Sequence, residues 1–315
     1  MKKNLSHQDM YELFTNNDDI PYNDAMAYTM FPQHNWVYNK LLLYQKLNIP
    51  SGPFGTTPTI FPIVIKPVIS IKGFSRGFYK IHNLQQYTDL GYVIGSFWSP
   101  FFSGTHLIQD FILHNGNIKL YGTLKAIDGN KGTFKEFQLV KKNIPKQTSD
   151  FIKKYFHSYT GLLNVETIGD NIIEIHLRLN GDNYVFDKHI HKYIVQLFYN
   201  NTWNFNKQII HKNKYIFPIF YTPGININFH IIKYILSKFQ INTYNFNYNI
   251  YDNSFLSPGG KRYVIFDTYN RQHGLQAKKL ILILFRITHF ISYIIKFILI
   301  ISIIYFIQLI LYNQI

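Results

Sequence analysis

The segment Ile172–Leu179 carries three side chains of different chemistry in one alternating row. If it is a β-strand, Glu174, His176 and Arg178 fall on one face. The other face then holds Ile173, Ile175, Leu177 and Leu179. A carboxylate, an imidazole and a guanidinium in one row can hold a metal ion, a phosphate or a carboxylate. An ordinary amphipathic strand with a solvated face would show the same alternation.

Length and composition narrow the kinds of site that this strand could belong to. A chain of 315 residues can bury a real core, as one large domain or two small ones. It has no cysteine, which excludes disulfides, cysteine-ligated zinc, iron–sulfur clusters and thiol nucleophiles. A metal would therefore bind to Asp, Glu, His, Asn or backbone oxygen, which favours a hard cation such as Mg²⁺.

The charge balance points to an anionic partner. Lys and Arg number 32 against 17 Asp and Glu, so the net charge is +15. Such an excess suits nucleotides, nucleic acid or the anionic face of a membrane. The chain is also rich in Asn, Ile, Lys, Tyr and Phe, and an A/T-rich coding bias would explain the charge equally well.

Apolar spacing and turn residues predict an α+β chain. We expect a poorly ordered polar lead-in over residues 1–35 and a small α+β subdomain over residues 214–279. Between them we expect a helix over 36–47, strands over 61–67 and 92–97, and hairpins over 107–126 and 162–179. The second hairpin turns at Gly169–Asn171, which would bring Glu166 and Glu174 together on neighbouring strands.

The chain is almost entirely apolar from Leu280 onward. The stretch Phe290–Leu311 is long enough to cross a hydrocarbon layer of about 30 Å, and its one charge, Lys296, lies near one end. Basic residues precede it, at Lys278, Lys279 and Arg286, and no charged residue follows. This bias predicts a membrane tail anchor over residues 288–312, with the main domain facing the cytoplasm. The alternative is a buried or interfacial helix.

Three short motifs earlier in the chain could hold phosphates. Asn39-Lys40 opens the predicted helix, and Phe61-Pro-Ile-Val-Ile-Lys66-Pro67 places a lysine at a strand end. Such a lysine is a point cation that can bind a phosphate. Gly73-Phe-Ser-Arg-Gly77 is a glycine-bounded loop whose backbone N–H groups could approach phosphate oxygens closely.

Together with the Glu166–Glu174 hairpin, these motifs resemble, in order, the ATP-grasp superfamily of carboxylate–amine ligases, over roughly residues 36–182. The resemblance implies an ATP-grasp-like fold of two α+β lobes around a nucleotide cleft, in a core over residues 36–213. It also implies that ATP phosphorylates a small-molecule carboxylate and that an amine then displaces the phosphate. Mg²⁺ would be the metal, with Mn²⁺ as the alternative.

The resemblance also assigns residues to roles. Nucleotide binding would involve Lys40, Lys66, Gly73, Ser75, Arg76 and Gly77, with Trp98 over the base. The metal would be held by Glu166, Glu174 and His176, the last of which stands where the family usually has Asn. Catalysis would depend on Lys66 and Arg178, whose guanidinium could bind the substrate carboxylate or the transferring phosphate.

Two departures from the family leave other functions open. The segment before Lys40 is too short for the N-terminal α/β subdomain of many members, and the usual acidic residue near the adenine is not evident. The alternatives are a catalytically inactive ATP-grasp-like binding or scaffold protein, and a basic membrane-associated nucleic-acid-binding protein. The nucleic-acid reading is not favoured, because alternating aromatic residues near 242–251 fit a strand with one core face.

Overall fold

A computed structural model describes residues 20–21, 23–69, 77–129, 133–180, 188–203, 214–221, 228–246, 256–257 and 260–312. The helices are α2 (Asp24–Met30), the 3-10 helix η1 (Asn35–Tyr38), α3 (Lys40–Lys46), α4 (Leu84–Asp89), α5 (Lys146–Tyr155), α6 (Lys188–Asn200), α7 (Phe229–Lys238) and α8 (Arg271–Tyr312). The strands are β1 (Gly52–Pro53), β2 (Ile63–Pro67), β3 (Tyr79–Ile81), β4 (Ser96–Pro100), β5 (His106–His114), β6 (Asn117–Asp128), β7 (Phe134–Leu139), β8 (Gly161–Ile168), β9 (Asn171–His176), β10 (Lys214–Tyr221), β11 (Thr243–Phe246), β12 (Leu256–Ser257) and β13 (Gly260–Thr268).

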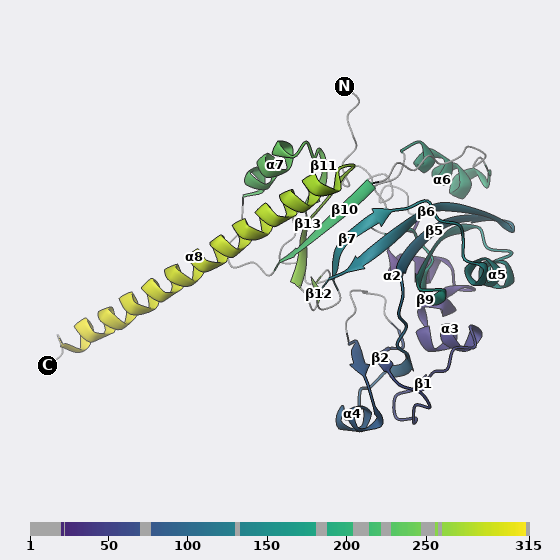
Figure 1. Cartoon of the computed structure of the whole chain (residues 1–315), viewed down its shortest axis with the longest axis horizontal. Coiled ribbons are helices and arrows are strands. Elements are labelled where there is room, and N and C mark those ends of the chain that lie inside the picture. Colours follow the sequence, from purple (N-terminus) through teal and green to yellow (C-terminus); the bar gives the residue numbers. More distant parts are fainter. Residues whose placement is uncertain are drawn as a thin grey trace.

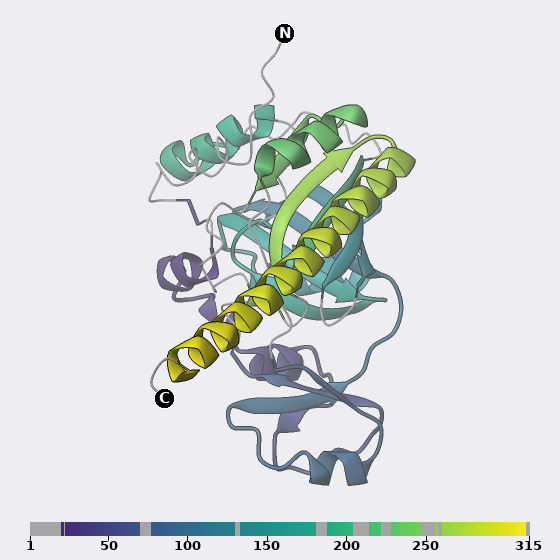
Figure 2. The same ribbon diagram turned by 90° about the vertical axis from the view of Figure 1, so that its left-hand side faces the viewer.

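The strands form two antiparallel sheets of unequal size (Figure 1). A four-stranded sheet in the order β1-β4-β2-β3 makes a small lobe with α4, and Figure 2 shows this lobe set apart below the large sheet. A nine-stranded sheet runs β11-β13-β10-β7-β6-β5-β8-β9, with β12 paired to β13. Helices cover its faces and its β9 end. The predicted α+β class with two lobes is therefore confirmed.

The small lobe is built around Ile63 and Ile65 of β2, which are fully buried with Trp98 of β4. The strand predicted over 92–97 is wrong at its start, because β4 begins at Ser96. Gly95 has a left-handed φ of 69°, which interrupts the extended chain just before the strand. Tyr92 lies outside the strand and is 75% exposed.

Both predicted hairpins are present in the large sheet. Strands β5 and β6 pair around Asn115 and Gly116, which adopt positive φ as a tight turn requires. Strands β8 and β9 pair around Gly169, and Glu166 is the register partner of Glu174. The predicted juxtaposition of the two carboxylates is confirmed.

The predicted alternation along β9 is wrong at Ile173. The register shifts between Glu166 and Thr167, so that Thr167 pairs with Ile172. Because of this irregularity, Ile172 is fully buried, whereas its neighbour Ile173 is only partly buried. Beyond it the alternation holds, because Ile175 and Leu177 belong to the core beneath the sheet.

Within the segment expected to be a loosely ordered lead-in, Asp24–Met30 form helix α2. Asn23 caps its start, since its side-chain oxygen accepts the N–H of Met26 at 2.8 Å. Ala27 is fully buried against the β8–β9 side of the core. This short helix is therefore held by a cap and by packing rather than by a long apolar stripe.

The chain beyond residue 213 contains both strands and helices, as predicted, but its strands continue the large sheet. Strand β10 pairs with β7 on one side and β13 on the other. The division of the chain into a core over residues 36–213 and a subdomain over residues 214–279 stays a prediction. Under that division β7 and β10, which are hydrogen-bonded to each other, would belong to different units.

Helix α8 leaves the domain as a single long element (Figure 1). Its stretch Arg271–Ile307 is long and apolar enough to cross a membrane, and only 6% of its most apolar part is buried. Its first turns pack on the large sheet, and from Tyr293 to Ile307 every residue is exposed.

Candidate functional site

Two lysines from different lobes meet beside the β8–β9 hairpin. Lys40 is the first residue of α3, directly after the capping Asn39, and its Nζ lies 2.9 Å from Oε1 of Glu174. Lys66 lies near the end of β2, and its Nζ donates to the Tyr44 hydroxyl at 2.6 Å. A backbone hydrogen bond also joins the segments that carry the two lysines, because the Lys40 N–H donates to the carbonyl of Val68, two residues after Lys66.

Two aromatic rings lie beside the Lys66 ammonium group. Its Nζ lies 4.4 Å from the ring centre of Tyr44 and 5.5 Å from that of Phe97. Burial, with a smaller effect of Lys40, lowers the pKa of Lys66 to about 7. A phosphate brought to this position would favour the protonated lysine and raise that pKa.

The functional face of β9 is held by a carboxylate from α2. Oδ1 of Asp24 lies 2.9 Å from Nδ1 of His176, and Oδ2 accepts from the Arg178 guanidinium at 2.6 Å. The Tyr38 hydroxyl, in η1, donates to the same carboxylate at 3.3 Å. Asp24 lies 152 positions from His176, the last residue of β9, and 154 positions from Arg178, just beyond it, so only the fold brings them together.

The ring of His176 is thereby turned toward the two glutamates. With Nδ1 engaged by Asp24, Nε2 lies 3.6 Å from Oε1 of Glu174 and 3.9 Å from Oε1 of Glu166. Burial alone would lower the pKa of His176, but Asp24 outweighs it and the pKa is raised. Burial alone would raise the pKa of Asp24, but His176 and Arg178 hold it well below its usual range.

A second histidine lies on the other side of Glu166. His106 begins β5, diagonally across from Glu166 on β8, and its Nε2 lies 3.2 Å from Oε2 of that carboxylate. Its Nδ1 faces Asp128 at 3.8 Å. Burial lowers the pKa of His106, but the two carboxylates more than offset this and raise it to about 9.

The structure thus brings together Lys40, Lys66, Glu166, Glu174, His176 and Arg178 from the predicted set. Trp98 is separated from them. It neighbours Phe97, the register partner of Lys66, so its side chain lies on the opposite face of the small sheet. There its indole N–H donates to the Thr56 hydroxyl at 2.8 Å.

The glycine-rich loop lies largely outside the described residues, and this includes Gly73, Ser75 and Arg76. Gly77 is described and has a left-handed φ of 68°. A side chain there would also press on the ring of Pro67, next to Lys66. The role predicted for this loop stays a prediction.

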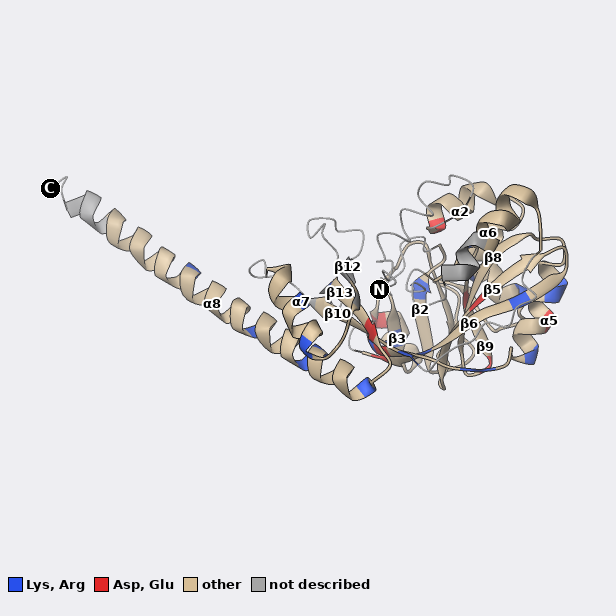
Figure 3. Ribbon diagram, turned by 90° about the horizontal axis from the view of Figure 1, so that it is seen from above, with Lys and Arg blue, Asp and Glu red and all other residues tan. Residues whose placement is uncertain are grey.

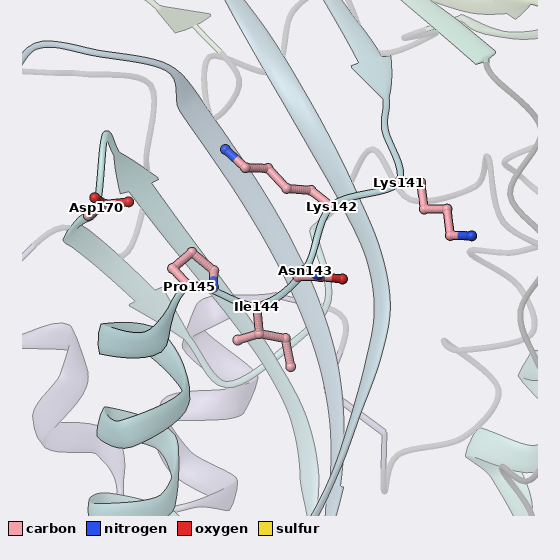
Figure 4. A pocket seen from close by; sticks show the side chains of 6 residues that line it. All are labelled: Lys141, Lys142, Asn143, Ile144, Pro145 and Asp170. Carbon is pink, nitrogen blue, oxygen red and sulfur yellow. The ribbon is translucent and has the colours of Figure 1, made fainter.

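An open hollow of about 550 Å³ lies at the tip of the β8–β9 hairpin (Figure 4). Asp170 comes from the hairpin turn, and Lys141 and Lys142 come from the segment that follows β7. None of the predicted site residues lines this hollow. We therefore place the candidate site at the lysine–carboxylate cluster rather than in the hollow.

The two carboxylates suit a hard cation when nucleotide phosphates complete its ligands. Mg²⁺ in proteins binds to one or two carboxylates, keeps several waters and takes phosphate oxygens from the substrate. Glu166 and Glu174 supply that pair on adjacent strands. Among the described residues, no group of three or more His, Asp or Glu side chains is arranged as a ready metal centre. A role of His176 as a third ligand therefore stays a proposal.

Neither a comparison of the sequence with protein-family models nor one with curated proteins finds a match. Solved structures do resemble the chain. An L-amino acid ligase from Bacillus licheniformis aligns with a TM-score of 0.57 at 11% identity, over 81% of this chain and 74% of that one. An N5-carboxyaminoimidazole synthetase from Staphylococcus aureus, complexed with ADP, aligns with a TM-score of 0.59 at 10% identity, over 88% and 77%.

The chain has an ATP-grasp fold. A carboxyaminoimidazole ribonucleotide synthase from Aspergillus clavatus, complexed with ATP, agrees at a TM-score of 0.56 and 12% identity, over 78% of this chain and 72% of that one. At such identities the likeness concerns the fold alone. Within this fold the lysines and carboxylates described above lie where the small lobe meets the large sheet.

Sequence reasoning missed three members of the cluster, namely Asp24, Tyr38 and His106. Asp24 lies in a polar stretch whose only local signal was Asn23, a good helix N-cap, directly before it. His106 directly precedes the predicted first hairpin, but its contact with Glu166 depends on the pairing of β5 with β8. Nothing in the spacing along the chain reports that pairing.

Proposed function

We propose that this protein is an ATP-dependent ligase that joins a carboxylate to an amine through an acyl-phosphate and is tethered to a membrane. The observation that carries the proposal is the cluster of Lys40, Lys66, Glu166, Glu174 and Arg178 on an ATP-grasp fold. Charges of both signs, partly shielded from water, suit the transfer of a phosphoryl group between two bound substrates.

The two lysines are the proposed phosphate ligands. Lys66 reaches the cluster from the small lobe and Lys40 from the large one, so a polyphosphate between them would bridge the lobes. Lys40 is held by Glu174 in the structure. Phosphate oxygens would replace Glu174 as its partner and release that carboxylate for a cation.

Glu166 and Glu174, with His176 beside them, are the proposed metal residues. These residues would hold Mg²⁺, which would supply charge neutralisation for the phosphates. Mn²⁺ is the alternative, because imidazole nitrogen suits it better than it suits Mg²⁺. His106 keeps the second oxygen of Glu166 in place, since the two groups are 3.2 Å apart.

The proposed reaction has two steps. In the first, an oxygen of the substrate carboxylate attacks the γ-phosphorus of ATP; a P–O bond forms, the β,γ-bridging P–O bond breaks and ADP leaves. In the second, the amine nitrogen attacks the acyl carbon; the C–N bond forms, the C–O bond to phosphate breaks, and the amine nitrogen loses a proton. Arg178 would bind the carboxylate or stabilise the charge on the transferring phosphate.

Hydroxylamine trapping tests this proposal before either substrate is known. Hydroxylamine converts an acyl-phosphate into a hydroxamate, so the full-length protein is incubated with ATP, Mg²⁺, hydroxylamine and pools of carboxylic acids. We expect hydroxamate and ADP to form together and both to be lost in Lys66→Ala. Lys153→Ala removes an exposed lysine from α5 and is the matched control. Unchanged turnover in Lys66→Ala would refute the proposed site.

A nucleotide-binding protein without catalysis is the second candidate, and one observation favours it. Arg178 is already engaged by Asp24 and by the carbonyl of Leu179, so fewer of its donors remain for a substrate. Calorimetric binding of ATP together with an absence of ADP formation and hydroxamate would identify this case.

Membrane attachment through α8 is the remaining part of the proposal. An exposed apolar helix of this length is compatible with a tail anchor, and the basic residues that precede the bare stretch support the proposal that the main domain faces the cytoplasm. After carbonate extraction the full-length protein should remain in the membrane pellet. Its release into the supernatant would refute the anchor.

A further inference from the structure

Helix α8 is held by the domain through one stripe of side chains, which we call the inner stripe. It consists of Ala277, Ile281 and Phe285, which are at most 1% exposed and pack with β10 and β13. Gly274 allows this close approach, because a Cβ at that position would collide with the ring of Phe217. The Lys278 ammonium group donates to the carbonyl of Pro218 at 2.9 Å. The first turns of α8 are therefore part of the domain.

The opposite side of the same turns carries a second apolar row, which we call the outer stripe. It consists of Leu280, Ile283, Ile287 and Phe290, spaced three or four residues apart as neighbours on one helix face must be. Within the part of the chain that the structure describes, these side chains remain 38–66% exposed. An apolar helix face that is left open beside a packed one calls for a partner.

Cations accompany the outer stripe. Lys279 and Arg286 are exposed and lie one residue before Leu280 and Ile287, respectively. Figure 3 shows basic positions spaced along this half of α8. Large apolar residues with Lys and Arg beside them are the combination by which an amphipathic helix binds an anionic lipid surface.

The length of the apolar helix fits a bilayer in the same way. From Leu280 to Tyr312 it measures about 50 Å at 1.5 Å per residue, whereas the hydrocarbon layer is about 30 Å thick. With both headgroup layers the bilayer reaches about 40–45 Å. The helix is thus longer than the bilayer is thick, and this extra length places the outer stripe at headgroup level on a tilted helix.

We propose that the outer stripe of α8 docks on the surface of an anionic lipid bilayer, so that the domain rests directly on the membrane that receives the end of the helix. This inference rests on the membrane part of the proposed function and is independent of the ligase part. The helix is continuous from the inner stripe to its bare end, so the domain and the anchor turn together as one body.

Site-specific fluorescence tests the docking, because the chain has no cysteine of its own. Single cysteines are introduced by Ile283→Cys in the outer stripe, Ile301→Cys in the bare helix and Lys153→Cys on α5, which Figure 1 shows at the far end of the domain. Each full-length variant is labelled with an environment-sensitive dye. The proteins are then reconstituted in phosphatidylcholine–phosphatidylglycerol vesicles that contain nitroxide-labelled lipids.

We expect lipid nitroxides to quench the labels at positions 283 and 301 but not the label at 153. Quenching at 301 without quenching at 283 would overturn the docking and leave the anchor standing. A label at 283 in apolar surroundings that lipid nitroxides do not reach would mean that a second copy of the chain covers the stripe, and it would also overturn the docking. Absence of quenching at 301 would refute both the anchor and the docking.

Vesicles of phosphatidylcholine alone test the charge of the partner. Without phosphatidylglycerol, quenching at 283 should weaken while quenching at 301 stays the same, because only the outer stripe depends on Lys279 and Arg286. Equal quenching at 283 in the two kinds of vesicle would overturn the preference for an anionic surface.

Discussion

Replacing Asp24 by alanine should destabilise the protein strongly, because it leaves two buried partners without their anion. The side chains of Asp24 and Arg178 are 6% and 17% exposed, and their atoms lie 2.6 Å apart. Removing one member of a buried ion pair costs about 3–5 kcal/mol of unfolding free energy. Arg178 also donates to the carbonyl of Leu179 and reaches some water, which favours the lower end of that range. The Tyr38 hydroxyl, which would lose Asp24 as its acceptor, adds about 1 kcal/mol.

We therefore expect Asp24→Ala to lose about 3–4 kcal/mol, measured by urea unfolding of the full-length protein in detergent micelles and followed by tryptophan fluorescence. Asp89→Ala is the matched control. Asp89 also accepts a side-chain hydrogen bond, from Gln85 at 2.7 Å, but on an exposed helix, so it should cost no more than about 0.5 kcal/mol.

A double-mutant cycle with Arg178→Ala isolates the pair from other effects of the substitution. The coupling free energy between Asp24 and Arg178 should be at least about 1 kcal/mol, because the two groups are in direct contact. If Asp24→Ala cost no more than Asp89→Ala, or if the two site substitutions were additive, α2 would not lock the face of β9 and the reasoning would fail.

Three further predictions follow from the site and from α8. Because burial lowers the pKa of Lys66 to about 7, nucleotide binding at pH 8 should take up a proton, and binding heats should vary with the ionisation enthalpy of the buffer in wild type but not in Lys66→Ala. The raised pKa of His106, about 9, should stabilise the fold by about 3 kcal/mol below pH 6.5, an effect that is lost as the pH rises through 9. Unfolding free energies measured across this range should show that loss in wild type and not in His106→Gln. Gly274→Ala should lower the unfolding free energy by about 1–3 kcal/mol in the same urea assay, because its Cβ meets the ring of Phe217; an unchanged value would show that α8 can shift without cost.

The parts of the site that lie close in sequence could be predicted, because local rules determine them. Glycine at position 169 with a positive φ makes the β8–β9 turn, which brings Glu166 and Glu174 close together on adjacent strands, and the register shift beside Glu166 then places them directly opposite each other. Lys66 at the end of an apolar strand and Lys40 after a capping asparagine follow equally local signals. The bulge that buries Ile172 in place of Ile173 was missed, because a strict alternation of buried and exposed residues does not allow for an extra residue in one strand.

The rest of the site depends on contacts between distant segments. Asp24 meets His176 only because α2 packs on the β9 end of the sheet. The apolar residue of α2 that this packing buries is a single small one, Ala27. His106 meets Glu166 because β5 lies between β6 and β8. Strand order of this kind is set by the global fit of the core. The continuation of the large sheet through β10 is another example.

Strand β9 lies at the edge of the large sheet, and this position gives the N-terminal segment with Asp24 and Tyr38 a second role. A strand at a sheet edge has unpaired backbone groups that invite a strand of another molecule. Here the Leu177 N–H, just beyond β9, donates to the Tyr38 hydroxyl at 3.2 Å, and that hydroxyl in turn donates to Asp24. The residues that orient the site thus also occupy a backbone donor at this edge of the sheet. Damage to this segment would leave the edge more open to pairing with a strand of another molecule.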